Sequence, residues 1–568
     1  MQWPRVPRQY FLFFPCDTMN SKHHSDLRVV MAQQDFLVGD IYDNAGRIVQ
    51  ACLQARDELA ADVIVFPELT LTGYPPEDLL FRPHFLEHVE AAVDYLREKV
   101  TGITAIIGYP LRQQNELFNV AGIFQDGEIT VYRKQHLPNY GVFDEKRYFK
   151  PGKLPCVVNV RDVPIGITVC EDIWESGPVR QTTAAGARLL INLNASPFHT
   201  GKREDRELLL SCLARKAGIP MMYVNLVGGQ DELVFDGSSF VVDQQGELAQ
   251  RAPSCETGLF VVDFEVGEEI TPRAGECVPH EDDVAAIYRV LVLGVRDYIE
   301  KNHFSGAVLG LSGGVDSALT LAIAVDAIGA DRVEAVMMPS RYTADMSLED
   351  AHAEADALGV EYHEIPIEAP FSSFQTVLEE TFTGLLPDTT EENIQARCRG
   401  IILMAISNKK RKILLTTGNK SEMSVGYATL YGDMAGGFAP IKDVPKLLVY
   451  RLCEYRNSLG RVIPQRVLER PPSAELAPDQ KDADSLPAYE ILDPILERYI
   501  EQDQGVEEIV AAGFDHATVV RVAGMVDRNE YKRRQAPPGV RITQRAFGRD
   551  RRYPLTSGYN HGVHGFNT

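Results

Sequence analysis

Short apolar runs recur through the first half of the chain. Segments such as LRVVMAQ, VIVFPEL, GITVCED and LLINLNAS are rich in Val, Ile and Leu. This pattern predicts β-strands, and Gly-containing connections such as FQDGEI and DQQGEL indicate hairpins among them. Ile48, Cys52, Ala55 and Leu59 recur at helical spacing, which gives one apolar helix face. We therefore expect mixed sheets in residues 27–265, with helices packed outside them.

The second half has a different rhythm. A long amphipathic helix is predicted at about residues 284–302, and strands then alternate with helices. The predicted strands are AVLGL, RVEAVMM, EYHEIPI and KILLTTG. Such alternation is typical of right-handed crossovers and a parallel sheet. The sequence therefore places this half in the doubly wound α/β class.

Chain length and a change in composition predict the domain organisation. At 568 residues the chain is too long for one ordinary core, so two large domains are expected. Residues 266–283 are acidic, carry Pro and Gly and show no periodicity, as a linker would. We expect domains at 27–265 and 284–568. The aromatic patch within residues 1–26 is too short for a signal-peptide core, and we interpret this segment as a disordered extension.

Charge and cysteine content narrow the class of partners. The net charge of −23 argues against general binding to nucleic acid or to an anionic membrane. No apolar run approaches the length of a membrane span. The nine cysteines include no CxxC pair, which suits reduced thiols in the cytoplasm and gives no zinc pattern. A phosphate site in this chain must supply its own local cations.

A glycine-rich loop, SGGVDS, joins the predicted strand AVLGL to a predicted helix. Gly313 and Gly314 let backbone N–H groups approach an anion, and the helix N-terminus adds partial positive charge. Asp316 is understandable if Mg²⁺ bridges its carboxylate to phosphate oxygens. The absence of a lysine after the glycines separates this loop from the GxxxxGK[ST] pattern. An ordinary strand-to-helix turn is the alternative, but the full hexapeptide favours nucleotide binding.

Further segments narrow the substrate. The loop resembles the SGGxDS motif of ATP pyrophosphatases, and ENIQAR, TTGNKSE and YGDMAGGFAPIKDVPK resemble segments of the NAD⁺ synthetases. The resemblance implies ATP and deamido-NAD⁺ as substrates, with Asp316 and Glu422 on Mg²⁺ and Asn393, Glu422 and Lys532 near deamido-NAD⁺. For ATP it implies Thr417 and the loop residues Gly310, Leu311, Ser312, Gly313, Gly314, Val315, Asp316 and Ser317. Asp433 and Lys446 match further site positions.

Three reactive side chains follow apolar strands in the first half. Glu68 follows VIVFP, Lys134 follows ITVYR and Cys170 follows GITV. Taken singly, they would be a surface acid, a solvated lysine and a buried inert thiol. Three reactive types at three strand ends are better explained as one site. A thiolate attacks an amide carbon well when a nearby base or cation activates it.

The contexts of these residues resemble the glutaminase branch of the nitrilase superfamily, which shows FPELxLTGYPPEDLL, KxxLPNYxVFDExRYF and CEDIW. The resemblance implies an α-β-β-α sandwich, with Glu68 as general base, Lys134 stabilising charge and Cys170 attacking glutamine. It also places Tyr140, Ser196 and a basic residue of GKR at the glutamine. Lys202 matches by gapless spacing, and Arg203 is the alternative.

Together the two halves resemble the glutamine-dependent NAD⁺ synthetase family. The resemblance implies a ligase that hydrolyses L-glutamine or takes free ammonia, passes ammonia between its domains and forms dimers or multiples of dimers. Two other readings stay open from the residues alone. Another ATP-pyrophosphatase amidotransferase, such as a GMP or asparagine synthetase, would share SGGVDS. A glutamine hydrolase whose second domain only senses a nucleotide, and performs no chemistry, would share the residues of both halves.

Two C-terminal segments suit substrate closure. Residues 470–489 are polar and rich in Pro, as a mobile lid that excludes water would be; a plain surface connection is the alternative. Residues 528–552 hold nine Lys or Arg against two acids. We interpret this stretch as closing over the phosphates of a dinucleotide, with a solvated tail or nucleic-acid binding as alternatives.

Overall fold

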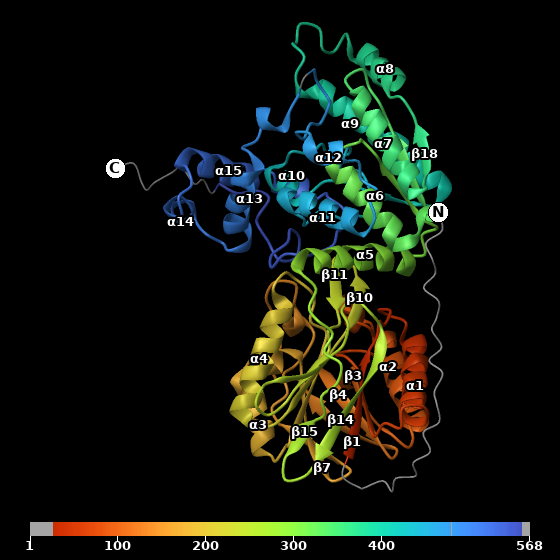
Figure 1. Ribbon diagram of the computed structural model, residues 1–568, viewed down its shortest axis with the longest axis vertical. Coiled ribbons are helices and arrows are strands. Elements are labelled where there is room, and N and C mark those ends of the chain that lie inside the picture. The colour runs from red at the N-terminus through yellow and green to blue at the C-terminus, as the bar shows by residue number, and fades with distance from the viewer. Residues whose placement is uncertain (1–25, 479, 559–568) are drawn as a thin grey trace.

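The computed structural model describes residues 26–478 and 480–558, which form two parts stacked end to end (Figure 1). The expected N-terminal extension lies outside the described residues, apart from its last residue. Helix α5 (Asp283–Lys301) lies at the junction of the two parts. No helix within the described ranges is both long and apolar enough to cross a membrane.

Two mixed sheets face each other in the first part. The seven-stranded sheet has the order β15-β14-β1-β2-β3-β4-β5, with β1 Asp26–Gln33, β2 Val63–Val65, β3 Thr104–Gln113, β4 Glu116–Gln125, β5 Glu128–Arg133, β14 Gly258–Val266 and β15 Ile270–Pro272. The six-stranded sheet has the order β13-β12-β9-β8-β7-β6, with β6 Cys156–Val160, β7 Val163–Val169, β8 Leu189–Asn194, β9 Met221–Asn225, β12 Phe240–Val242 and β13 Leu248–Arg251. In each sheet three neighbouring strands are parallel and the outer pairs are antiparallel.

Apolar side chains fill the space between these sheets, and helices cover their outer faces. Val29, Val65, Ile167 and Leu193 belong to the cluster between the sheets. The first sheet is covered by α1 (Ile41–Asp57) and α2 (Pro83–Lys99), and the second by α3 (Ser176–Ala184) and α4 (Lys202–Ala217). The predicted α-β-β-α sandwich is confirmed. Strand β15 carries the first sheet into the segment expected to be a linker.

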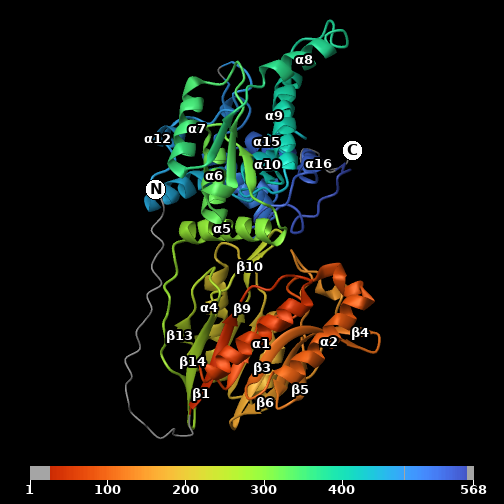
Figure 2. The same cartoon turned by 90° about the vertical axis from the view of Figure 1, so that its right-hand side faces the viewer.

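A four-stranded parallel sheet organises the second part, in the order β18-β17-β16-β19. Its strands are β16 Ala307–Gly310, β17 Val333–Met337, β18 Glu361–Glu364 and β19 Ile413–Leu415. In Figure 2, α6 (Val315–Ile328) and α7 (Asp345–Leu358) lie on one side of this sheet and α9 (Thr389–Lys410) on the other. Separate apolar clusters fill the two faces, and the predicted doubly wound class is confirmed.

The direction of the chain through this sheet defines its ligand edge. From β16 the chain winds outward to β17 and β18, then returns to place β19 on the other side of β16. The carboxyl ends of β16 and β19 therefore flank a switch point, where ligands of open α/β sheets bind. Both predicted nucleotide segments, SGGVDS and TTGNKSE, leave the sheet here.

The remaining helices of the second part lie outside this sheet order. They are α8 (Glu368–Leu378), α10 (Lys420–Val425), α11 (Lys446–Leu459), α12 (Gln465–Glu469), α13 (Tyr489–Leu496), α14 (Val506–Ala511), α15 (His516–Arg528) and α16 (Glu530–Arg533).

The junction between the two parts is packed and hydrogen-bonded. The hairpin of β10 (Val227–Gln230) and β11 (Leu233–Asp236) packs against α5. The Gly229 N–H donates to Asp297 Oδ2 at 2.6 Å, and Lys301 Nζ donates to Asp35 Oδ1 at 2.7 Å. Phe198 and Val234 of the first part share an apolar cluster with α5 and α6. The relative position of the two parts therefore rests on a true core.

A buried glutamate in this core makes the stability of the protein depend on pH. Glu354 on α7 is fully buried, and neither carboxylate oxygen has a hydrogen-bond partner among the described residues. Burial raises the pKa of Glu354 from 4.5 to about 8. Between these two pH values the unfolded chain ionises this carboxyl while the native chain keeps it protonated. Stability is therefore lost as the pH rises from 4.5 to 8, by about 3 kcal/mol at pH 7.

We expect Glu354→Gln to remove this loss, because Gln has a similar shape and does not titrate. The gain in apparent Tm over wild type should be several degrees larger at pH 8 than at pH 5, measured by thermal unfolding at both values. Asp356→Asn, at an exposed position of the same helix, is the matched control. An equal change in Tm at both pH values would contradict the prediction.

Candidate active sites

A buried ion pair connects two of the predicted residues of the first part. Glu68 follows β2 and Lys134 follows β5 in the seven-stranded sheet. Lys134 Nζ lies 2.7 Å from Glu68 Oε1, and both side chains are fully buried. Asn119 Nδ2 donates to the same oxygen at 2.7 Å, and the Ala195 N–H donates to Glu68 Oε2 at 3.3 Å. Glu68 thus accepts three hydrogen bonds inside the sandwich.

Cys170 approaches this pair from the other sheet, immediately after β7. Its φ angle of 46° lies in the left-handed region, which is strained for a residue other than glycine. The Cys170 N–H donates to Asn192 Oδ1 at 2.9 Å. Burial raises the pKa of the Cys170 thiol well above its usual value; the charge of Glu68 adds to this rise and Lys134 opposes it. The resting side chain is therefore a thiol that needs a base.

Glu145 completes the charged group, and the sequence reasoning missed it. It begins a short 3₁₀ turn (Glu145–Arg147), and its Oε1 lies 2.8 Å from Lys134 Nζ. Burial raises the pKa of Glu145 to about 8, against the opposing charge of Lys134. Glu145 is the glutamate of the quoted VFDExRYF context, so the motif contained the signal. Nothing in the apolar pattern distinguished it from the neighbouring charged residues.

Two of the residues expected at the glutamine contact the segment that follows Cys170, and the third follows β8 of the second sheet. Tyr140 is exposed, and its hydroxyl donates to Glu171 Oε1 at 2.9 Å. Lys202 Nζ lies 3.9 Å from the centre of the Trp174 ring, and burial lowers its pKa to about 8. Ser196 is buried, and its hydroxyl accepts from Arg206 Nε at 3.2 Å.

The structure separates the basic residues of this segment. Arg203, the alternative to Lys202, donates to the Glu281 carbonyl in the expected linker. Arg206, which the sequence reasoning missed, is buried and forms a 2.8 Å ion pair with Asp236. It also donates to the Ser196 carbonyl at 2.7 Å. The signal for Arg206 was its position one helical turn beyond Lys202, on the same face of α4.

The SGGVDS loop of the second part has the shape that its glycines predict. Gly313 has a φ angle of 75°, and a Cβ atom there would lie 2.4 Å from the Ser347 carbonyl oxygen. The Gly314 N–H donates to Ser312 Oγ at 3.3 Å, and Ser317 Oγ donates to the Gly314 carbonyl at 2.9 Å. The loop leads directly into α6, so its N–H groups lie at a helix N-terminus.

Asp316 and Glu422 converge on one lysine, although they come from the loops after different strands. Lys446 Nζ forms an ion pair with Asp316 Oδ2 and lies 3.3 Å from Glu422 Oε1. Asn419, a member of the TTGNKSE segment without an assigned role, donates to Asp316 Oδ1 at 2.8 Å. Burial raises the pKa of Glu422 to about 8; Lys446 opposes this rise and Asp316 adds to it. Thr417 is half-buried just beyond β19 on the same edge.

The other predicted substrate residues gather at the loop after α10. Thr429 Oγ1 donates to Asn393 Oδ1 at 2.8 Å, and the Thr429 N–H donates to Asp433 Oδ1 at 2.6 Å. Lys532 Nζ donates to the carbonyls of Gly426 and Ala428, each at 2.8 Å. Asn393, Asp433 and Lys532 therefore meet around one loop, and Glu422 stands at its beginning.

Two C-terminal segments were expected to close over the substrate. The start of the first lies against the glycine loop, whereas three arginines of the second are buried in ion pairs. Arg470, at the start of the expected lid, donates to the Gly313 carbonyl and to Ser347 Oγ, so it lies against the glycine loop. The basic stretch was interpreted from its excess charge as a phosphate clamp. This interpretation is wrong for three of its members, which are buried and ion-paired with carboxylates: Arg533 with Glu530, Arg541 with Asp550, and Arg551 with both Asp527 and Glu530.

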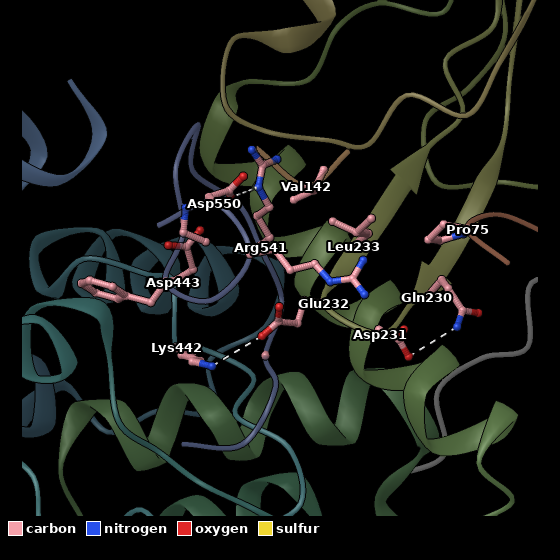
Figure 3. A pocket seen from close by; sticks show the side chains of 14 residues that line it. Pro75, Val142, Gln230, Asp231, Glu232, Leu233, Lys442, Asp443, Arg541 and Asp550 are labelled. Carbon is pink, nitrogen blue, oxygen red and sulfur yellow. Dashed lines mark hydrogen bonds and ion pairs between the residues drawn. The ribbon is translucent and has the colours of Figure 1, made fainter. Parts of the chain in front are cut away.

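A pocket opens between the two parts of the molecule (Figure 3). Val142 and Leu233 of the first part and Lys442 and Arg541 of the second are among its lining residues. Lys442 Nζ lies 3.5 Å from Glu232 Oε1 across it. The predicted site residues lie elsewhere in the described part of the chain. A smaller neighbouring pocket shares Val142 and Leu233 and reaches Glu145.

The residues of the first part suit the hydrolysis of an amide, and those of the second part suit the binding of a nucleoside triphosphate. This is the organisation of a carbon–nitrogen ligase that takes its nitrogen from an amide. Residues 28–270 match the carbon-nitrogen hydrolase family, and residues 287–536 match the NAD synthase family.

Several known proteins share both halves with this chain. It is 49% identical over 539 residues to the glutamine-dependent NAD(+) synthetase of Xylella fastidiosa strain 9a5c, covering 94% of this chain and 99% of that protein. It is 48% identical over 536 residues to that of Acinetobacter baylyi, covering 94% and 98%. The structure of the Acinetobacter baumannii glutamine-dependent NAD⁺ synthetase with ADP matches with a TM-score of 0.77 and 45% identity, covering 95% and 100%. The chain belongs to the glutamine-dependent NAD⁺ synthetase family.

The contact between Glu145 and Lys134 can be tested directly. We expect Glu145→Gln to lower glutamine-driven synthesis by ~10²-fold, because it removes one of the two carboxylates that hold Lys134. Synthesis from added ammonium should persist. Burial raises the pKa of Glu145 to about 8, and Gln does not titrate. The inflection near pH 8 in the wild-type kcat/KM for glutamine should therefore be shallower in the variant, where only Lys202 of this pair of groups still titrates near that pH.

Glu128→Gln, at an exposed position on β5, is the control for the charge change. A variant that keeps the wild-type rate and pH profile would exclude Glu145 from the chemistry.

Proposed function

We propose that residues 27–265 release ammonia from glutamine and that residues 284–568 use it to amidate deamido-NAD⁺ activated by ATP. As a member of its family, the chain is a carbon–nitrogen ligase, and its products are NAD⁺, AMP, diphosphate and glutamate. The observation that carries this proposal is the buried Glu68–Lys134 pair beside the strained turn of Cys170. Burying charged side chains costs free energy, and groups of this kind cluster at functional sites.

The first site suits thioester chemistry. Glu68 takes the thiol proton as Cys170 attacks the carboxamide carbon of glutamine, and it returns the proton to the departing ammonia. Lys134 stabilises the thiolate and the oxyanion of the tetrahedral intermediate. Water then hydrolyses the thioester to glutamate. Tyr140, Ser196 and Lys202 bind glutamine in this proposal, with Arg206 fixing Ser196 from behind.

The second site suits adenylyl transfer. Residues 310–317 and Thr417 bind the phosphates of ATP through backbone N–H and hydroxyl groups. Asn393, Glu422 and Lys532 bind deamido-NAD⁺, whose carboxylate attacks the α-phosphorus so that diphosphate leaves. Ammonia then displaces AMP from the acyl adenylate. Arg470 lies against the loop, and the segment that follows it is suited to excluding water from this intermediate.

Asp316 and Glu422 fit a Mg²⁺ site. Their oxygens are hard ligands of the kind that Mg²⁺ prefers, and both already contact the same cationic nitrogen, Lys446 Nζ. Bound Mg²⁺ would neutralise charge on the phosphate oxygens. Lys446 holds the two carboxylates together and adds a positive charge beside the loop.

We also propose that the protein forms homodimers or multiples of dimers and works in the cytoplasm. In support of assembly, α8, α9 and the loop between them project from the second part (Figure 2) and expose six large apolar side chains: Phe374, Val377, Leu385, Leu386, Ile401 and Met404. Exposed apolar clusters of this kind mark association surfaces. In support of the location, the eight cysteines in the described ranges are free thiols.

Cys170→Ala tests the division of labour between the two sites. We expect glutamine-driven synthesis to fall to background, because no other group at this site can form the thioester. Synthesis from ammonium should continue at the wild-type rate. Both rates can be measured as NAD⁺ formation on the same preparation, with the exposed Cys212→Ala as control. Equal loss of both activities would reject the assignment.

Asp316→Asn tests the second site. It removes a carboxylate that contacts Lys446 and would contact Mg²⁺, so we expect synthesis from either nitrogen source to fall by ~10²-fold or more. Hydrolysis of glutamine alone should continue at a measurable rate. A variant that retains full ammonium-driven synthesis would refute the role of Asp316.

A further inference from the structure

A single carboxylate joins the two sheets of the first part beside the triad. Asp172 is fully buried and lies two residues after Cys170. Its Oδ1 accepts hydrogen bonds from the backbone N–H groups of Gln135 at 3.0 Å and His136 at 2.8 Å. Its Oδ2 accepts from the Tyr132 hydroxyl at 2.7 Å and from the Val169 N–H at 3.1 Å. All four donors are supplied by the protein itself.

The positions of these donors connect Asp172 to the reacting groups. Tyr132 lies two residues before Lys134, and Gln135 and His136 are the two residues after it, so the carboxylate brackets the lysine along the chain. Val169 immediately precedes Cys170. Lys134 belongs to the end of one sheet and Cys170 to the end of the other. Asp172 is therefore a direct link between the segment that carries the lysine and the turn that carries the thiol.

The Cys170 turn needs such support. Its left-handed backbone is strained, and strained conformations persist only when surrounding contacts determine them. Asn192 holds the Cys170 N–H, and Asp172 holds the N–H of the residue before it. Hydrogen bonds to a carboxylate are shorter and stronger than those between neutral groups. Burial raises the pKa of Asp172, and its hydrogen bonds and Lys134 oppose that rise.

We propose that Asp172 is a positioning residue that fixes the ammonium of Lys134 relative to the thiol of Cys170. The proposal rests on the proposed glutaminase function of the triad and adds a group that touches neither glutamine nor the reacting atoms. A displacement of about 1 Å between catalytic groups can cost ~10²-fold in rate. The carboxylate matters here for its four accepted hydrogen bonds, which no neutral side chain of the same shape can accept together.

Asp172→Asn is the test, because the amide has the shape of the carboxylate but replaces one acceptor oxygen with a donor that faces other donors. We expect kcat for glutamine hydrolysis to fall by ~10²-fold, with KM for glutamine changed less than a few-fold. Ammonium-driven synthesis should stay at the wild-type rate. Glu175→Gln makes the same chemical change at an exposed position three residues away and should have no effect.

The reactivity of the Cys170 thiol shows whether Asp172 positions Lys134 or only stabilises the fold. The pH dependence of Cys170 alkylation by iodoacetamide can be followed by mass spectrometry of the peptide that contains it. With Lys134 displaced, the thiolate loses the cation that lowers its pKa, so the midpoint of alkylation should move to higher pH in Asp172→Asn. Wild-type hydrolysis and an unmoved midpoint would overturn the proposal. So would parallel loss of both synthetic activities with a lower Tm.

Tyr132→Phe provides a second variant if Asp172→Asn does not fold. It removes one donor to Asp172 and leaves the carboxylate in place. We expect a several-fold loss of glutamine hydrolysis and a smaller shift of the alkylation midpoint in the same direction. Wild-type behaviour in both measurements would overturn the proposal. Cys170→Ala serves as the reference, because retained glutamine hydrolysis there would instead defeat the proposed function of the triad.

Discussion

A buried ammonium group held between two carboxylates stands at the centre of each site. Lys134 and Lys446 each contact two acids from distant segments of the chain: Glu68 and Glu145 in the first site, Asp316 and Glu422 in the second. Removing a charged group from water costs several kcal/mol, which is offset only when its partners are in place. In each trio burial raises the pKa of one carboxyl to about 8, so the site can shed a charge by protonation. The fold must therefore deliver all three groups together.

Strand ends meet this requirement in two different ways. In the first part, the ends of β2 and β5 supply Glu68 and Lys134 from one sheet, and the end of β7 supplies Cys170 from the other. The apolar layer between the sheets then excludes water from the point where they meet. In the second part, the reversal of strand order separates the loops after β16 and β19, at the edge where ligands of open α/β sheets bind. Each arrangement places the reactive side chains in loops that directly follow strands.

The sequence could predict the reactive side chains that directly follow apolar strands. It could not predict the side chains that contact them only after folding. Cys170 and Asp316 stand directly after recognisable strands or within a recognisable loop. Asp172 was missed because three of its four hydrogen-bond donors lie 36 to 40 residues away, and no local pattern records such a contact. Arg206 follows Lys202 by one helical turn, but its carboxylate partner Asp236 lies 30 residues away. The interpretation of residues 528–552 as a phosphate clamp was wrong for Arg533, Arg541 and Arg551 for a related reason. Composition counts cations, but the carboxylates that neutralise several of them become neighbours only after folding.

Besides the packed junction at α5, a short C-terminal segment links the two sites. The Ile542 N–H donates to Asp443 Oδ2 of the second part at 2.8 Å, and its carbonyl accepts from the Thr200 N–H of the first part at 2.9 Å. Asp443 lies three residues before Lys446, and Thr200 lies between Ser196 and Lys202. A single buried residue thus hydrogen-bonds to segments that lead into both sites. Because packed cores are not continuously deformable, a shift of the loop before Lys446 cannot occur without strain on the segment that holds the glutamine residues.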